Sequence, residues 1–275
     1  ICHWTDRADD ESMLLSAIRS GAGGVDPFIA LLLSTTAADQ RACAAQYAAT
    51  MGPGSKLYSA PAPRQNQKIR IGYLSGDFRD HPVAYLAAEL FELHDRSKFE
   101  VIGYSHGTDD RSEQRARIAK SFDKFVDGQK FSDREFSERI AGDGIDILID
   151  LSGYTESGRA GVVCRRPAPI QVNYLGYPGT LGAKHIDYII ADHFVLPPEH
   201  RPFYAEQPVY LPDCYQVNDS KRAIAAQTPT RTACGLPDDA FVYCCFNNSS
   251  KITPEFFTVW MNLLRQVPGS VLWPL

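Results

Sequence analysis

Apolar and polar positions follow two different patterns along the chain. In residues 1–50, apolar side chains recur at helical spacing, first in "DESMLLSAIRS" and then in "DPFIALLLS" and "AADQRACAAQYAATM". Residues 52–67 are rich in Pro, Gly and polar residues, which is typical of a linker. The pattern predicts a helical linker region, residues 1–60, ahead of the main domain.

From residue 69 onward, short apolar runs alternate with amphipathic segments. The runs "IRIGYL", "FEVIGYS", "IDILIDL", "IQVNYLG" and "DYIIAD" predict strands, and "IDILIDL" is apolar throughout, as expected for a strand buried on both faces. The segments "HPVAYLAAELFELHD", "RSEQRARIAKSF" and "SDREFSERIAGDG" predict helices, and Ser132 and Glu135 form a capping box in the last of them. This alternation predicts an α/β fold with a doubly wound parallel sheet, a Rossmann-like domain over residues 61–220.

A second α/β unit is predicted near the end of the chain. Residues 216–238 are polar and rich in turn-forming residues, so they are expected to form another linker. "FVYCCFN" then predicts a strand, and "TPEFFTVWMNLLRQVPG" predicts a helix with Thr253 as N-cap and Pro254 at its first position. With "SVLW" as the next strand, residues 235–275 are expected to start a second Rossmann-like half.

Composition and charge narrow the class of protein. The 275 residues suffice for two domains, and 44% hydrophobic with 22% charged residues is ordinary for a soluble globular protein. A net charge of −5 argues against nucleic-acid binding, and no apolar run approaches the roughly 20 residues that span a membrane. The seven scattered cysteines lack zinc or redox spacing. We therefore expect a cytoplasmic protein with mostly buried thiols and neither a nucleic-acid nor a membrane partner.

Asp77 and His81 are the first candidates for chemistry, because they follow the first predicted strand of the parallel sheet. Ligands of such sheets bind at the carboxyl ends of the strands. A carboxylate four residues before an imidazole can orient it, and an oriented histidine with a near-neutral pKa suits general-base catalysis on a hydroxyl. In the structural alternative, Asp77 caps the following helix and His81 fills a turn.

Three further loops carry candidate binding groups. Glycines in "LSGYTESGRAG" (151–161) and "LGYPGTLGA" (175–183) allow close approach of the backbone to a ligand, and Tyr154 and Tyr177 could stack on a sugar. In "FNNSSKITPE", Lys251 precedes a helix N-terminus, an arrangement that attracts phosphate without a Walker loop. The alternatives are simple turn chemistry for the two glycine-rich loops and a solvated side chain for Lys251.

Taken together, "RIGYLSGDFRDHPVAYL", "GIDILIDLSGYT", "RPAPIQVNYLGYPGT", "DYIIAD" and "VYCCFN" resemble the cytoplasmic O-GlcNAc transferase family, glycosyltransferase family 41, which includes plant SPINDLY-type proteins. The resemblance covers nearly the whole chain. It implies a GT-B architecture of two Rossmann-like halves facing a cleft, preceded by tetratricopeptide repeats. It also implies that the chain is a catalytic region truncated within the second half, and that this segment alone has little or no turnover.

The family resemblance also implies a reaction and a set of residues. Family members transfer a sugar, with inversion and without a cofactor or required metal, and we expect transfer from UDP-GlcNAc to Ser or Thr of intracellular proteins. His81 matches a histidine that acts as base or active-site organiser, Asp77 matches the acid before it, and Lys251 matches the lysine that neutralises the departing diphosphate. The positions that match the substrate site are Tyr154, Leu175, Gly176, Pro178 and Asn248.

Several positions depart from the pattern of the animal enzymes. Glu156 replaces a lysine, Phe28 a histidine and Val83 a threonine, and a large insert between the catalytic halves is missing. These departures indicate a bacterial-like or plant-like member. They leave open another donor, GDP-fucose or UDP-glucose, and a non-catalytic protein-binding module is the alternative of a different class.

Overall fold

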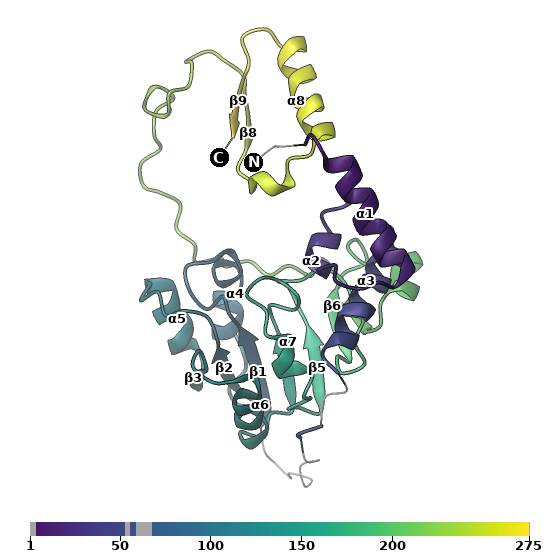
Figure 1. Ribbon diagram of the computed structural model, residues 1–275. Coiled ribbons are helices and arrows are strands. Elements are labelled where there is room, and N and C mark those ends of the chain that lie inside the picture. Colours follow the sequence, from purple (N-terminus) through teal and green to yellow (C-terminus); the bar gives the residue numbers. More distant parts are fainter. Residues whose placement is uncertain (1–3, 53–55, 59–67, 275) are drawn as a thin grey trace. The chain divides into compact units, whose positions relative to one another are not determined.

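The computed structural model describes residues 4–52, 56–58 and 68–274 (Figure 1). Most of the linker predicted over residues 52–67 therefore lies outside the described residues. The chain divides into a larger unit, Leu15–Arg222, and a smaller unit that combines Ile1–Leu14 with Ala223–Leu275.

A seven-stranded sheet forms the centre of the larger unit (Figure 1). All neighbouring strands are parallel, in the order β3-β2-β1-β4-β5-β6-β7. The direction of winding changes between β1 and β4, which makes these two strands the topological switch point of the sheet. The strands are β1 (Ile69–Ser75), β2 (Phe99–Ser105), β3 (Lys124–Asp127), β4 (Ile147–Asp150), β5 (Ile170–Asn173), β6 (Tyr188–Ala191) and β7 (Gln207–Tyr210).

Five helices of the larger unit, α2 to α6, begin at residues whose side chains accept a hydrogen bond from the first turn. Ser132 and Glu135 form the predicted capping box of α6, with the Ser132 side chain accepting from the Glu135 N–H and the Glu135 side chain accepting from the Ser132 N–H. In "DPFIALLLS" the helix covers only Pro27–Ala30, with Asp26 as its N-cap, in agreement with the short helix expected there. No helix of the described residues is long and apolar enough to cross a membrane. The helices are α1 (Arg7–Ser20), whose first half lies in the smaller unit, α2 (Pro27–Ala30), α3 (Ala37–Thr50), α4 (Pro82–Glu92), α5 (Glu113–Ser121), α6 (Asp133–Gly142) and α7 (Ala160–Val163).

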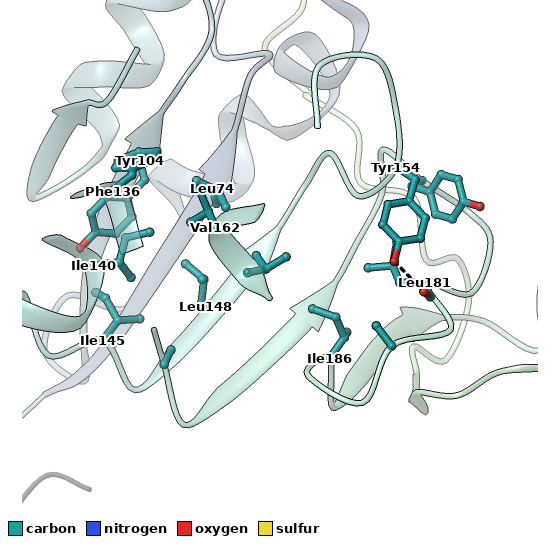
Figure 2. Close-up of a cluster of buried hydrophobic side chains, with 14 of the residues drawn as sticks. Leu74, Tyr104, Phe136, Ile140, Ile145, Leu148, Tyr154, Val162, Leu181 and Ile186 are labelled. Carbon is teal, nitrogen blue, oxygen red and sulfur yellow. Dashed lines mark hydrogen bonds between the residues drawn. The ribbon is translucent and has the colours of Figure 1, made fainter. Parts of the chain in front are cut away.

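Two hydrophobic clusters sandwich the sheet, because successive strand residues point to opposite faces. Leu148 of β4 belongs to one cluster and Ile149 to the other, which confirms that this strand is buried on both sides. The first cluster, shown in Figure 2, includes side chains of α6 and α7 such as Phe136 and Val162. The second includes side chains of α4 and α5, among them Phe91. Full burial of each such side chain contributes about 1.5–3 kcal/mol.

The smaller unit contains one β-α-β element, as predicted. Strands β8 (Val242–Cys245) and β9 (Val271–Pro274) are parallel, and helix α8 (Pro254–Gln266) connects them. The Thr253 side chain accepts a hydrogen bond from the Phe256 N–H, and Pro254 occupies the first turn, so both predicted start signals are confirmed. Lys251 ends a short 3-10 turn, Ser249–Lys251, just before this helix.

The prediction of mostly buried thiols is wrong for the described cysteines. Cys43 and Cys164, in the larger unit, are buried. Cys214 and Cys244 are exposed, while Cys234 and Cys245 are partly exposed. Three of these four lie in the smaller unit.

Candidate active site

The candidate site lies where β1 and β4 end, at the switch point of the sheet. The segments that follow these strands touch: a side chain on Gly76 would place its Cβ 2.8 Å from the Ser157 carbonyl oxygen. In the same place Ser157 Oγ donates a 2.8 Å hydrogen bond to Asp77 Oδ2 across 80 positions of sequence. Open parallel sheets bind their ligands at this point, so Asp77 is where the topology predicts a functional group.

Asp77 is only 3% exposed, and its two carboxylate oxygens have different surroundings. Oδ2 is held by Ser157, and the backbone N–H of Asp77 donates to Ser75 Oγ at 2.9 Å. Oδ1 lies 3.7 Å from His81 Nε2 and 3.6 Å from Arg79 Nη2, which is too far for a normal hydrogen bond. Among the described residues, Oδ1 has no hydrogen-bond partner. Asp77 Oδ1 is therefore a buried hydrogen-bond acceptor that could bind a donor group of a ligand.

His81 is the N-cap of α4, which corrects the structural alternative in which Asp77 caps this helix. The Val83 N–H donates to His81 Nδ1 at 3.3 Å. Because Nδ1 accepts, the proton of the neutral ring sits on Nε2, the nitrogen that faces Asp77. Burial lowers the pKa of His81, Asp77 raises it and Arg79 lowers it, with a net lowering. The ring is therefore neutral at physiological pH and presents an N–H.

A buried arginine supports the segment between Asp77 and His81. Arg115 is 6% exposed and donates to the Phe78 carbonyl oxygen at 3.0 Å from α5. Its other terminal nitrogen donates to Asp127 at 2.9 Å, so the guanidinium links this segment to the end of β3. Nothing in the spacing of the sequence singles out Arg115, because its partners come from three separate segments.

Tyr154 and Tyr177 are packed together in the core rather than displayed as free ring faces. They are 6% and 2% exposed, and their ring centroids lie 5.6 Å apart. The Tyr154 hydroxyl donates to the Leu181 carbonyl oxygen at 2.8 Å, as Figure 2 shows. The role of Tyr154 in substrate binding stays a prediction.

The loop after β5 holds Leu175, Gly176 and Pro178 beside the loop after β4. Leu175 has a φ of 69°, a left-handed conformation that strains a residue with a branched side chain. A Cβ on Gly176 would lie 2.0 Å from the Leu151 carbonyl oxygen, so only glycine fits this approach. Pro178 is exposed. The three residues thus lie at the carboxyl edge of the sheet, and their contact with a sugar stays a prediction.

Asn248 and Lys251 lie in the smaller unit, in the connection from β8 to α8. The Asn248 side chain accepts from the Ser250 N–H at 2.9 Å and caps the 3-10 turn that ends at Lys251. Lys251 is exposed and forms no ion pair within the described part of the chain. The structure brings Asp77 and His81 together in the larger unit, and a meeting of His81 with Lys251 stays a prediction.

Two further histidines, His193 and His185, have structural surroundings. The His193 ring stacks on Tyr210 with 4.1 Å between centroids. Burial lowers the pKa of His185 to about 4. No group of three or more His, Cys, Asp or Glu side chains within residues 4–52, 56–58 and 68–274 could hold a metal ion. Metal independence of the reaction stays a prediction.

Comparison with known protein families assigns the chain. The family described as "Glycosyl transferase family 41" matches residues 43–228 and 222–275. The chain belongs to glycosyltransferase family 41. This family assignment agrees with the resemblance carried by the sequence motifs.

Family 41 relatives and a solved structure show the same relationship. A probable UDP-N-acetylglucosamine–peptide N-acetylglucosaminyltransferase of Arabidopsis thaliana, SEC, is 36% identical over 100% of this chain. SPINDLY of the same plant, whose name states the same probable activity, is 33% identical over 74% of the chain and 22% of its own length. The solved structure of a mutant O-GlcNAc transferase from Thermobaculum terrenum is 31% identical, with a TM-score of 0.73 over 88% of this chain and 45% of its own. The fold is thus α/β of the GT-B glycosyltransferase type, as predicted.

This family 41 chain spans only part of each relative, 30% of the length of SEC. The sequence pattern indicated Asp77 and His81 of its candidate site, but it did not indicate Ser157 or the buried Arg115. Ser157 stands in a loop already singled out for its glycines, directly after a buried strand. A search for hydroxyl side chains at neighbouring strand ends would have found it.

Proposed function

We propose that this protein transfers GlcNAc from UDP-GlcNAc to Ser or Thr hydroxyls of cytoplasmic proteins, with inversion and without a metal or cofactor. The observation that carries the proposal is the 36% identity over the whole chain to SEC, whose name states a UDP-N-acetylglucosamine–peptide N-acetylglucosaminyltransferase. The carboxylate and imidazole at the switch point of the sheet support it, because that is where such a fold binds its ligands.

In the proposed reaction the acceptor hydroxyl attacks the anomeric carbon in line, and Asp77 and His81 orient it or take its proton. The hydrogen bond from the Val83 N–H to His81 Nδ1 supports the orienting role. A neutral ring capped in this way offers a donor at Nε2 and no free lone pair. To act as a base, His81 would have to give up its helix-capping bond and move its proton to Nδ1.

Lys251 and the N-terminus of α8 stabilise the departing UDP in this proposal. The first backbone N–H groups of a helix carry partial positive charge, and α8 begins three residues after Lys251. An ammonium beside these donors places positive charge where the diphosphate develops negative charge. Such preorganised charge is often the largest single contribution to catalysis.

The test is a donor assay with the intact protein and a Ser/Thr-containing peptide. UDP-GlcNAc, UDP-glucose and GDP-fucose are offered separately, with and without a chelator, and the modified peptide is identified by mass spectrometry. We expect modification with UDP-GlcNAc that the chelator does not change. Modification with only one of the other sugars would replace the donor, and peptide binding without any transfer would favour a binding module.

A further inference from the structure

The loop between β5 and β6 has no regular structure, yet side chains from other elements hold its backbone. Asn173 Nδ2 donates to the carbonyl oxygens of Tyr177 and Gly179, both at 3.2 Å. The Tyr204 hydroxyl donates to the Pro178 carbonyl oxygen at 3.1 Å. These bonds fix the segment next to the strained Leu175, so its conformation is set from outside the loop.

Glu206 provides the most costly of these supports. It directly precedes β7, is 0% exposed, and accepts two hydrogen bonds of 2.6 Å, one from Thr180 Oγ1 and one from the Leu181 N–H. Burial raises the pKa of Glu206 by more than these hydrogen bonds lower it, so the net shift of this pKa is upward. No cationic side chain of the described residues forms an ion pair with Glu206. Burying a carboxylate without a counter-ion costs free energy, which the hydrogen bonds of Glu206 must offset.

The partners of Glu206 show why both of its oxygens must accept. Thr180 Oγ1 already accepts from the Gly182 N–H at 3.0 Å and from the Ala205 N–H at 3.2 Å, so its lone pairs are used and its single proton must be donated. The Leu181 N–H can only donate. A glutamine at position 206 could accept from only one of these donors through its amide oxygen. Its NH₂ group, itself a donor, would face the other one.

We propose that Glu206 is a positioning residue for the sugar of the nucleotide-sugar donor, acting through Thr180 and Leu181 on the loop that presents Leu175 and Pro178. This inference rests on the proposed function, since it assumes that the loop contacts the donor sugar. Glu206 itself touches only protein, and its charge-assisted hydrogen bonds are about twice as strong as neutral ones. They keep the loop in the one conformation in which Gly176 meets the Leu151 carbonyl.

Glu206→Gln in the intact protein tests the proposal, with Glu100→Gln as the matched control. Glu100 lies at the amino end of β2, away from the candidate site, and its carboxylate is bonded to Arg70 at 2.8 Å. For each variant we would measure kcat, KM for UDP-GlcNAc, Kd for UDP, and the thermal midpoint. Leaving one buried donor unsatisfied is expected to raise KM for UDP-GlcNAc by about tenfold in Glu206→Gln. Because UDP lacks the sugar, its Kd is expected to stay within about twofold of wild type.

The outcomes separate a positioning role from a structural one. A lower thermal midpoint with unchanged KM, or equal losses of UDP-GlcNAc and UDP affinity, would overturn the proposal. If Glu206→Gln fails to fold, Thr180→Val removes the hydroxyl that donates to Glu206 and should raise KM for UDP-GlcNAc without changing Kd for UDP. Thr180→Ser keeps a hydroxyl and should have the KM of the wild type. Equal KM values for Thr180→Val and Thr180→Ser would also overturn the proposal. No transfer by the wild type would overturn the proposed function and, with it, this inference. Transfer by the wild type with an unaffected Glu206→Gln would overturn the inference alone.

Discussion

Asp77 Oδ1 and His81 Nε2 face each other at 3.7 Å at the end of β1. The other nitrogen of the ring, Nδ1, is used by the Val83 N–H to cap α4. His81 therefore has two separable tasks, one in starting a helix and one toward the candidate site.

Replacing His81 separates these tasks. His81→Ala removes both the cap and the imidazole, and loss of an N-cap costs about 1 kcal/mol. His81→Asn keeps a capping side chain but has no imidazole. We expect both variants to lose about 10²-fold or more in kcat, because either role of the ring is lost. The thermal midpoint should fall in His81→Ala only. A wild-type rate in His81→Asn would show that the imidazole has no part in the reaction.

Removing the ammonium of Lys251 is expected to slow the chemical step. Loss of one charge-stabilising contact typically costs about 2.7–4 kcal/mol, so Lys251→Ala should lower kcat on the order of 10²–10³-fold. Lys98→Ala is the control, because the Lys98 side chain is 72% exposed and lies just before β2. This is the amino end of the strand, whereas Asp77 and His81 follow the carboxyl end of β1. Steady-state kinetics of the intact enzyme would decide, and an equal rate in the two variants would remove Lys251 from the mechanism.

A methyl group on Gly176 is expected to be poorly tolerated. Its Cβ would lie 2.0 Å from the Leu151 carbonyl oxygen, so one of the two loops must move. We expect Gly176→Ala to lower the free energy of unfolding by about 1–3 kcal/mol and to impair the candidate site. Gly142→Ala, at the end of α6, meets nothing within 4 Å and should be neutral or stabilising by up to about 1 kcal/mol. Similar urea midpoints for the two alanine variants would contradict the close approach.

The buried His106 makes stability depend on pH. Burial, reinforced by Arg159, lowers the pKa of His106 from 6.5 to about 3. Between these values the unfolded chain binds a proton that the folded protein does not, so stability falls as the pH decreases, by about 1.4 kcal/mol per pH unit at most. Above pH 6.5 the contribution is fully present. His106→Leu should therefore flatten the loss of stability on the acid side.

Urea unfolding at about pH 7.5 and about pH 5 would measure the effect of His106. The exposed His200 offers a matched control, and His200→Gln should keep the wild-type slope. His185, with its pKa lowered to about 4, adds a contribution of the same sign that remains in both variants. An unchanged slope in His106→Leu would mean that folding does not lower the pKa of His106.

The elements that the sequence predicted are those whose pattern lies within a few consecutive residues. β1 and β4 were predictable because each is a compact apolar run, and the caps at Ser132 and Thr253 were predictable because their partners lie three residues away. β3 was missed because "KFVD" has only two apolar residues and is a strand through its pairing with β2. Local patterns cannot reveal an element that pairing creates.

The candidate site shows the same division. Asp77 and His81 are four residues apart and were found together, whereas Ser157 reaches Asp77 from 80 positions away and was missed. Glu206 lies 26 positions from Thr180, and no sequence motif connects the two residues. Side chains that act on the site from another element become visible only when the sheet order is known.

The left-handed backbone of Leu175 has a consequence for directed evolution of this protein. Holding a leucine at a φ of 69° costs on the order of 1–2 kcal/mol, which glycine would not pay. Leu175→Gly would relieve this strain but would also remove a side chain that packs against the second hydrophobic cluster, so selection for heat resistance alone should leave this position free to vary. A library selected for sugar transfer should retain the leucine if its side chain lines the donor pocket, so the two selections would diverge at this one codon.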